Sequence, residues 1–384
     1  MSDANRTTTD VASTLEPPSA SLVRIGKQKK CGCFAVSRRR RYVGRALLLG
    51  LAVVFVTQMY GKQEFWKDVW VYGTLFPGEL PSDSLAELAG FQPRRGPAFD
   101  LSQLTVPRTE IRSGGPPKDG IPALSEPRLI SADQAAYLQP DDRVLGVIEG
   151  KDARAYPLKI LNYHEIVNDD VGETPIAVTY CPLCDSAAVF DRRTPLGKRD
   201  FGVSGFLYNS NVLMYDRGGR PESLWSQVKT QGISGPAAEQ SLKSVPLELT
   251  TWSDWRARHP HTQVLSPRTG HDRDYSRNPY GGYFETPQLM FPVQPLSDRL
   301  PTKQRLLGVW SGNTARAYPE SAFSPERTRV EDEIDGKRII VEFNPQTRSL
   351  RVAEAEAGIE WMYSLWFAWY AFHPKTDVFG KEEH

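Results

Sequence analysis

The stretch R-V-L-G-V-I-E-G-K-D-A-R-A-Y-P-L-K-I-L, residues 143–161, returns later in the chain as R-L-L-G-V-W-S-G-N-T-A-R-A-Y-P-E-S-A-F, residues 305–323. Each copy reads as an apolar strand, a turn that contains glycine, and a second strand that ends in A-R-A-Y-P. This order is typical of a β-hairpin. Because a repeated pattern of this kind marks a repeated structural unit, the sequence predicts an internal duplication.

A second repeated pattern follows each copy of the hairpin. Residues 252–265 and residues 366–379 share the skeleton W-x-x-W-x-x-x-H-P-x-T-x-V. Its tryptophans and histidine can share one face of a short helix, which the proline would end. The chain is therefore expected to contain two unequal related halves, 142–265 and 304–379. Their element order predicts an α+β fold that is β-rich, with mostly antiparallel sheet and short helices.

The composition limits the classes of protein to which the chain can belong. At 384 residues it is long enough for one large domain or two modest ones. The formal net charge is only +1, so no overall field attracts nucleic acid, and we expect none as a partner. Thirty prolines and thirty glycines indicate many turns and agree with a β-rich architecture. Four cysteines are too few for a disulfide-dense scaffold.

The N-terminal part differs in character from the rest of the chain. Residues 1–41 are basic and polar and are predicted to form a disordered cytoplasmic tail. Residues 42–61 contain an uncharged apolar run preceded by four arginines, which predicts a single transmembrane signal anchor with its N-terminus in the cytoplasm. A cleaved signal peptide is the alternative. Residues 62–104 are predicted to form an aromatic juxtamembrane segment and a linker.

This N-terminal segment also predicts where the remaining chain lies. A globular domain at residues 105–380 would be extracytoplasmic, either periplasmic or extracellular, and attached to the cell membrane by one N-terminal helix. Cys31 and Cys33 fall in the basic tail. They are either two ordinary cytosolic thiols or sites of lipid attachment beside the membrane.

The candidate site centres on Cys181 and Cys184 in T-Y-C-P-L-C-D-S, residues 179–186. C-x-x-C spacing lets two thiols face one ion or close a small ring. The repeat helps to separate scaffold from site, since the second half has no cysteine at the matching positions. His164 likewise has Glu326 opposite it rather than a histidine.

Other residues occur in both halves and are assigned to the scaffold. His259 and His373 each follow a W-x-x-W helix, where a histidine can hydrogen-bond the last carbonyls. Arg154 and Arg316 occupy the same place in the two A-R-A-Y-P strands and are expected to anchor the hairpins.

Several kinds of chemistry suit the cysteine pair. The chemistry we predict is a metal site in which Cys181 and Cys184 as thiolates, with the His164 imidazole, hold zinc or copper, and His271, Asp185 or water completes the site. Alternatively the thiols form a reversible disulfide, which an extracytoplasmic location favours. A third possibility makes Cys181 a nucleophile with His164 as its base. In the fourth possibility the thiols are static, and the domain is a non-catalytic module that binds a small molecule, a glycan or a protein.

The segment from residue 198 to residue 249 has no counterpart in the second half and is expected to form a wall of the site. Within it, residues 201–217 predict two strands joined by a turn at Asn209. The further candidates for lining a pocket are Tyr180, Asp185, Ser204, Asn209, Asp216, Trp225 and His271.

Several motifs of the chain resemble hallmarks of the domain-of-unknown-function 3179 (DUF3179) family. They are I-R-S-G-G-P-P-K-D-G-I-P-A-L-S-E-P, Y-H-E-I-V-N-D, T-Y-C-P-L-C-D-S-A, F-G-V-S-G-F-L-Y-N-S-N-V-L-M-Y-D-R, S-L-W-S-Q and R-D-Y-S-R-N-P-Y-G-G-Y. The resemblance covers roughly residues 105–380. It implies a membrane-anchored member of a bacterial and archaeal family whose proteins are often exported. It supports the domain boundary and the choice of site residues, but it implies no reaction.

Overall fold

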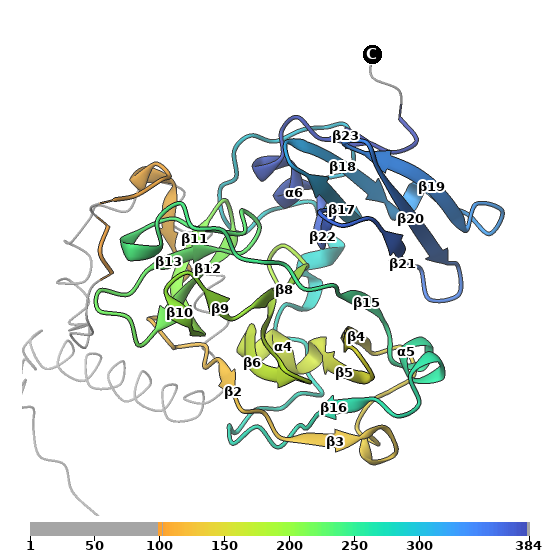
Figure 1. Cartoon of the computed structure of the whole chain (residues 1–384), viewed down its shortest axis with the longest axis horizontal. Coiled ribbons are helices and arrows are strands. Elements are labelled where there is room, and N and C mark those ends of the chain that lie inside the picture. Colours follow the sequence, from red (N-terminus) through yellow and green to blue (C-terminus); the bar gives the residue numbers. More distant parts are fainter. Residues whose placement is uncertain (1–98, 102, 382–384) are drawn as a thin grey trace, which may run out of the picture. The chain divides into compact units, whose positions relative to one another are not determined.

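The computed structural model describes residues 99–101 and 103–381, and most of the regular structure in them is β-strand (Figure 1). Three short α-helices occur in these residues: α4 (Leu158–His164), α5 (Trp252–Arg258) and α6 (Trp366–Phe372). The 3-10 turns are η1 (Arg108–Glu110), η2 (Ala132–Gln134), η3 (Gly235–Ala237), η4 (Gly281–Glu285) and η5 (Glu320–Ala322). The described strands pair mostly in antiparallel fashion, which confirms the predicted β-rich α+β class.

The first predicted hairpin forms the centre of a five-stranded sheet with the order β15-β4-β5-β16-β3. Its strands are β3 (Leu129–Ser131), β4 (Arg143–Glu149), β5 (Asp152–Pro157), β15 (Glu248–Thr251) and β16 (Gln263–Leu265). Gly150 turns the chain between β4 and β5 at a φ of 59°, which glycine adopts without steric cost. The strand β16 is parallel to β5, because α5 carries the chain back over the sheet.

The second predicted hairpin belongs to an eight-stranded sheet with the order β2-β6-β7-β8-β22-β17-β18-β23. Its strands are β2 (Leu124–Ser125), β6 (Ile166–Val171), β7 (Thr174–Cys181), β8 (Ser186–Asp191), β17 (Arg305–Ser311), β18 (Thr314–Pro319), β22 (Glu360–Leu365) and β23 (Asp377–Val378). Strands β8 and β22 pair with Ala187 opposite Tyr363. Strands from both predicted halves therefore share one sheet.

The strands around the two hairpins pair in the same order. The run β15-β4-β5-β16 corresponds to β22-β17-β18-β23, and the last strand of each run is parallel to its neighbour. In each case one helix, α5 or α6, precedes that last strand. Gly146 in β4 lies against Trp255, and Gly308 in β17 lies against Trp369. A Cβ atom on these glycines would come within 2.2 and 2.3 Å of the indole rings.

The scaffold residues named from the repeat make matching contacts. Arg154 donates to Asp169 at 3.0 Å, and Arg316 donates to Asp332 at 2.5 Å, so each arginine ties its hairpin to a later strand, as predicted. The histidines act differently from the expectation.

His259 and His373 each contact their helix through both the backbone N–H and the imidazole ring. The backbone N–H of His259 donates to the carbonyl of Trp255 at 2.8 Å, and that of His373 donates to Trp369 at 2.9 Å. Their rings lie on the same tryptophans, with centroids 4.2 and 3.9 Å apart. The histidines therefore close the helices, but the imidazole packs on indole instead of bonding a carbonyl.

Three further sheets complete the described part. One contains β1 (Ile111–Ser113), β11 (Asp200–Tyr208), β12 (Asn211–Arg217), β13 (Leu224–Ser226) and β14 (Gln231–Gly232); another contains β19 (Arg329–Ile334), β20 (Lys337–Asn344) and β21 (Ser349–Ala355); β9 (Arg193–Thr194) pairs with β10 (Gly197–Lys198). The predicted hairpin is β11–β12. Its turn residues Asn209 and Ser210 have φ of 49° and 63°, as a two-residue type I′ turn requires.

Strands β7 and β8 are buried on both faces, and this decides which way the cysteine loop presents its side chains. Successive strand residues point to opposite faces. Cys181 and Ala188 accordingly lie in one apolar cluster, while Tyr180 and Ala187 lie in another. The loop between the strands therefore serves two separate environments.

The predictions for the N-terminal part concern residues that the structure does not describe. Residues 1–98 are not described, and they include the predicted tail with Cys31 and Cys33, the predicted signal anchor, and nearly all of the aromatic segment. In residues 99–101 and 103–381 we find no helix of the length and apolarity that a bilayer crossing needs.

Candidate functional site

The two cysteines converge on one point in the protein interior. Cys181 ends β7, and Cys184 lies in the turn before β8, where its N–H donates to the carbonyl of Cys181 at 3.2 Å. Both are free thiols, 1% and 0% exposed. Their sulfur atoms lie 3.9 and 3.2 Å from the carbonyl oxygen of Ser210, which belongs to the β11–β12 turn. The C-x-x-C spacing thus brings both thiols to the same side, as predicted.

The two thiols differ in how easily they ionise. Burial alone would raise the pKa of Cys181, but the Cys184 side chain and the backbone N–H groups of Val212, Cys184 and Leu183 hydrogen-bond its sulfur and lower the pKa below the ordinary value. Burial, followed by the interaction with Cys181, raises the pKa of Cys184 well above its ordinary value. Cys181 is therefore the more readily ionised thiol of the pair.

A buried carboxyl group, which the sequence analysis missed, accompanies the pair. Glu165 follows α4 at a φ of 57° and is 7% exposed. Burial, and then the charge of Cys181, raise the pKa of this carboxyl well above its ordinary value. A buried carboxyl of raised pKa can exchange a proton with a neighbouring thiol. The only sequence signal was a glutamate directly before an apolar strand, and such a residue is usually exposed.

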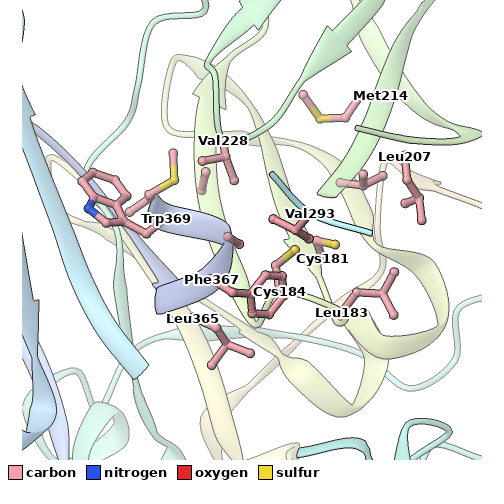
Figure 2. Close-up of a cluster of buried hydrophobic side chains, with 14 of the residues drawn as sticks. Cys181, Leu183, Cys184, Leu207, Met214, Val228, Val293, Leu365, Phe367 and Trp369 are labelled. Carbon is pink, nitrogen blue, oxygen red and sulfur yellow. The ribbon is translucent and has the colours of Figure 1, made fainter. Parts of the chain in front are cut away.

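Side chains from several distant segments cover the sulfur atoms (Figure 2). The same apolar cluster contains Val293 and Phe367, with Tyr283 from η4. The hydroxyl of Tyr283 donates to the carbonyl of Leu183 at 3.0 Å, and burial is the largest cause that raises the pKa of this tyrosine. Since Leu183 lies between the two cysteines, η4 is fastened directly over their loop.

A surface hollow of about 400 Å³ adjoins η4 and is lined by Phe284, Glu285 and Lys303, among others. The Nζ atom of Lys303 lies 3.4 Å from the centroid of the Tyr283 ring. Burial lowers the pKa of Lys303 to about 8. The turn η4 thus has the cysteine cluster on one side and a hollow with a cationic wall on the other.

His164, the predicted third ligand or base, has partners on both ring nitrogens. Nδ1 is 2.7 Å from the carbonyl oxygen of Pro122, and Nε2 is 2.6 Å from the hydroxyl of Tyr275. The exposed His271 approaches it, with ring centroids 5.2 Å apart. In the part of the chain that the structure describes, no group of three or more His, Cys, Asp and Glu side chains is placed to hold a metal ion.

Tyr180 and Asp185, two further candidates, lie together beside two arginines. The Asp185 carboxylate accepts two hydrogen bonds from Arg143, at 2.8 and 2.9 Å, and one from Arg305 at 2.8 Å. The hydroxyl of Tyr180 donates to it at 2.8 Å. Burial would raise the pKa of Asp185, but the two guanidinium groups outweigh it and hold the pKa below its ordinary value.

The remaining candidates have structural partners. Ser204 donates to the carbonyl of Leu213 at 2.5 Å, and the side chain of Asn209 accepts the N–H of Gln294 at 3.0 Å.

The last two candidates are buried. Asp216 accepts the N–H of Ser223 at 2.6 Å. Trp225 is in the same apolar cluster as the cysteines and packs edge-on against Phe201. The predicted residues therefore do not form one site: some lie in a cysteine cluster, some in a histidine pair and some at an arginine-bound carboxylate, while Ser204, Asn209 and Asp216 hydrogen-bond backbone groups elsewhere.

The fold and this site define a β-rich α+β protein with a buried cysteine pair. The chain belongs to the family described as "Protein of unknown function (DUF3179)", whose model matches residues 118–362, well over half of the chain. This confirms the family that the motifs indicated. Neither the curated proteins nor the solved structures contain a match to the chain.

Proposed function

We propose that Cys181 and Cys184 carry out thiol–disulfide exchange, with Glu165 as the proton carrier. The observation that carries this proposal is the convergence of two buried free thiols, whose sulfur atoms lie 3.9 and 3.2 Å from the carbonyl oxygen of Ser210. The lowered pKa of Cys181 and the raised pKa values of Cys184 and Glu165 support it. A dithiol site needs one thiol in the reactive thiolate form and a second thiol within reach. The cysteine pair meets both needs.

In the first step the Cys181 thiolate attacks one sulfur of a substrate disulfide and forms a mixed disulfide. The departing thiolate takes a proton from Glu165. The Glu165 carboxylate then takes the proton of Cys184, whose sulfur attacks Cys181 and releases the second substrate thiolate. Two electrons pass from the protein to the substrate, and the protein keeps a Cys181–Cys184 disulfide. The reverse sequence oxidises a substrate dithiol.

Access to the sulfur atoms requires η4 to move, because both cysteines are almost fully buried. This turn is held over them by the Tyr283 hydroxyl and lies in the long connection between β16 and β17. The neighbouring hollow has a volume of about 400 Å³. It provides space both for η4 when it is displaced and for the substrate that enters.

Equilibration with mixtures of oxidised and reduced glutathione tests the proposal. The full chain with Cys31 and Cys33 changed to serine leaves only the pair of interest. We expect both thiols to disappear together, with a mass loss of two hydrogens, and Cys184→Ser to accumulate glutathione on Cys181. If the folded protein keeps both thiols under strongly oxidising mixtures, while the unfolded chain loses them, the exchange proposal is wrong.

The same variants separate the other chemistries predicted for the pair. About one zinc or copper ion per purified chain, lost in Cys181→Ser, would favour the thiolate metal site. Alkylation of Cys181 that is unchanged in Cys184→Ser, without disulfide formation, would favour a lone nucleophile. The metal site and the lone nucleophile both need a free nitrogen on His164, but both of its ring nitrogens already have partners. The two converging sulfur atoms therefore support exchange more directly than they support either of these chemistries.

We also propose that residues 42–61 anchor the protein in the cell membrane with the domain outside the cytoplasm. An oxidising compartment is where a dithiol site of this kind would operate. Extraction of membranes with alkaline carbonate should leave the full chain in the pellet. A protein released by that treatment would exclude the anchor.

We infer in addition that the two halves arose by duplication. Matching strand orders and the matching Gly146–Trp255 and Gly308–Trp369 contacts support this. An experimental structure in which residues 143–161 and 305–323 fail to superpose would refute it.

A further inference from the structure

A cavity of about 170 Å³ lies on the other side of the cysteine loop and is unrelated to the proposed thiol chemistry. Residues of both predicted halves line it. Its charged lining residues are Arg143, Asp185, Arg305, Glu320 and Arg348. Arg143 and Arg305 are the first residues of β4 and β17, so they hold the same place in the two repeats.

The two matching arginines use only part of their hydrogen-bonding capacity on the protein. Arg143 binds Asp185 through Nη1, and Arg305 binds it through Nε. Within the described chain, no hydrogen bond is present from the other nitrogens of these two guanidinium groups. A guanidinium has five N–H donors, and two side by side suit a planar oxyanion. The side chains are 30% and 45% exposed, so solutes can reach them.

The buried carboxylate fixes the arginines without using up their charge. Asp185 neutralises one of the two guanidinium groups and is 1% exposed at its side chain. Arg348 adds a third cation, whose only partner in the described chain is a contact of 3.8 Å with Glu320. The three arginines face two carboxyl groups, which leaves an excess of positive charge for an anion to balance.

We propose that this cavity binds a small carboxylate, held by Arg143 and Arg305 with Arg348 at the entrance. The volume supports a ligand of few atoms, since pockets for drug-sized molecules measure roughly 300–1,000 Å³. Arg305 and Glu320 also line the hollow of about 400 Å³ beside η4. A longer acid can therefore place its carboxylate in the cavity and its remaining atoms in the hollow.

Thermal unfolding of the full chain tests the site with acetate and succinate as probes. Sodium chloride at equal ionic strength is the reference, and phosphate and sulfate are compared at the same concentration. We expect succinate to raise the unfolding midpoint in a saturable way, and Arg305→Gln to weaken the apparent affinity by about tenfold or more. Arg256→Gln, at an exposed arginine paired with Asp133, should leave it unchanged.

Arg348→Gln provides a second test in case Arg305→Gln fails to fold. Its side chain is 72% exposed, so its removal should weaken binding without loss of structure. No saturable shift with either carboxylate would overturn the proposal. A shift with phosphate and sulfate alone would overturn the assignment to carboxylates, and a shift that Arg305→Gln and Arg348→Gln both retain would move the site elsewhere. None of these results depends on thiol exchange.

Discussion

His164 is held by a series of hydrogen bonds that fixes the position of its proton. The carbonyl of Pro122 can only accept, so Nδ1 carries the hydrogen, and Nε2 accepts from Tyr275. The Tyr275 oxygen lies 2.6 Å from the hydroxyl of Thr269, which can donate to it. This arrangement suits a neutral imidazole. Burial is the largest cause that lowers the pKa of His164, to about 4, and the nearby His271 adds to it.

This histidine should make the protein less stable in mild acid. The folded pKa of about 4 is below the unfolded value of about 6.5, so the unfolded state binds more protons between these pH values. The free energy of unfolding should therefore fall as pH drops from about 6.5 to 4, by ~3 kcal/mol at most from this group. In His164→Asn, whose amide can still donate to Pro122, urea unfolding should show a shallower pH dependence.

Exposed His261, changed to glutamine, is the matched control and should leave the pH dependence of the unfolding free energy as it was. Some dependence will persist in both variants, since burial also lowers the pKa of His373 to about 4. Identical slopes for His164→Asn and the unchanged protein would show that His164 is not the responsible group.

The contacts of individual residues were the hardest feature to predict from the sequence. The type and position of His164 were evident, but its partners Pro122 and Tyr275 come from distant segments that only the fold brings together. Glu165 was missed for the same reason, because its burial depends on packing and not on its neighbours in sequence. The cysteine pair was found because its spacing alone places both sulfur atoms on one side.

At the scale of elements, the hairpins and the W-x-x-W helices followed from local patterns. Glycine and polar turn residues end strands, and proline ends helices, whatever the rest of the chain does. The close approach of Gly146 to Trp255 was not evident, although the glycine recurs at Gly308. This contact explains why both halves have a glycine at this position, since the tryptophan occupies the space that a side chain would need.

Gly146→Ala should destabilise the protein by overpacking. The added Cβ would lie 2.2 Å from the indole of Trp255, which is 1% exposed and cannot turn away freely. We expect the free energy of unfolding to fall by about 1–3 kcal/mol in urea titrations. Gly282→Ala is the control, because its Cβ would meet only the flexible end of Glu285, at 3.4 Å.

A second substitution shows whether the indole is the cause. Trp255→Phe in the Gly146→Ala background should cost less than the sum of the two single changes, since the smaller ring gives the new methyl group room. Additive losses would mean that the glycine is needed for another reason.

At the scale of the whole molecule, the joining of the two halves could not be read from the sequence. Local patterns predict most of these strands, but the pairing of β8 with β22 shows only one matched pair of residues, Ala187 and Tyr363. Side-chain hydrogen bonds such as those from Trp361 to Leu247 and from Asn344 to Asp254 also join the halves, and the loop that carries the cysteines supplies a further connection. Its Asp185 binds Arg143 of one half and Arg305 of the other through a single buried carboxylate.

Asp185→Asn should therefore loosen the junction between the halves. An amide carries no charge to balance either guanidinium group, and removal of one partner from a buried ion pair costs about 3–5 kcal/mol. The loss should appear in urea unfolding at pH 7. Asp133→Asn, whose side chain is 88% exposed and also pairs with an arginine, should change the stability by less than about 0.5 kcal/mol.

The pH dependence of the unfolding free energy of this variant tests whether the Asp185 carboxylate is the source of the lost stability. Arg143 and Arg305 hold the pKa of Asp185 below its ordinary value, against the effect of burial. Because the folded pKa is below the unfolded one, the stabilisation is present at neutral pH and is lost as pH falls through the folded pKa. The difference in unfolding free energy between Asp185→Asn and the unchanged protein should therefore shrink in acid. A difference that stays constant to the lowest pH at which both proteins fold would assign the loss to altered packing, and the ion pair would not be what holds the halves together.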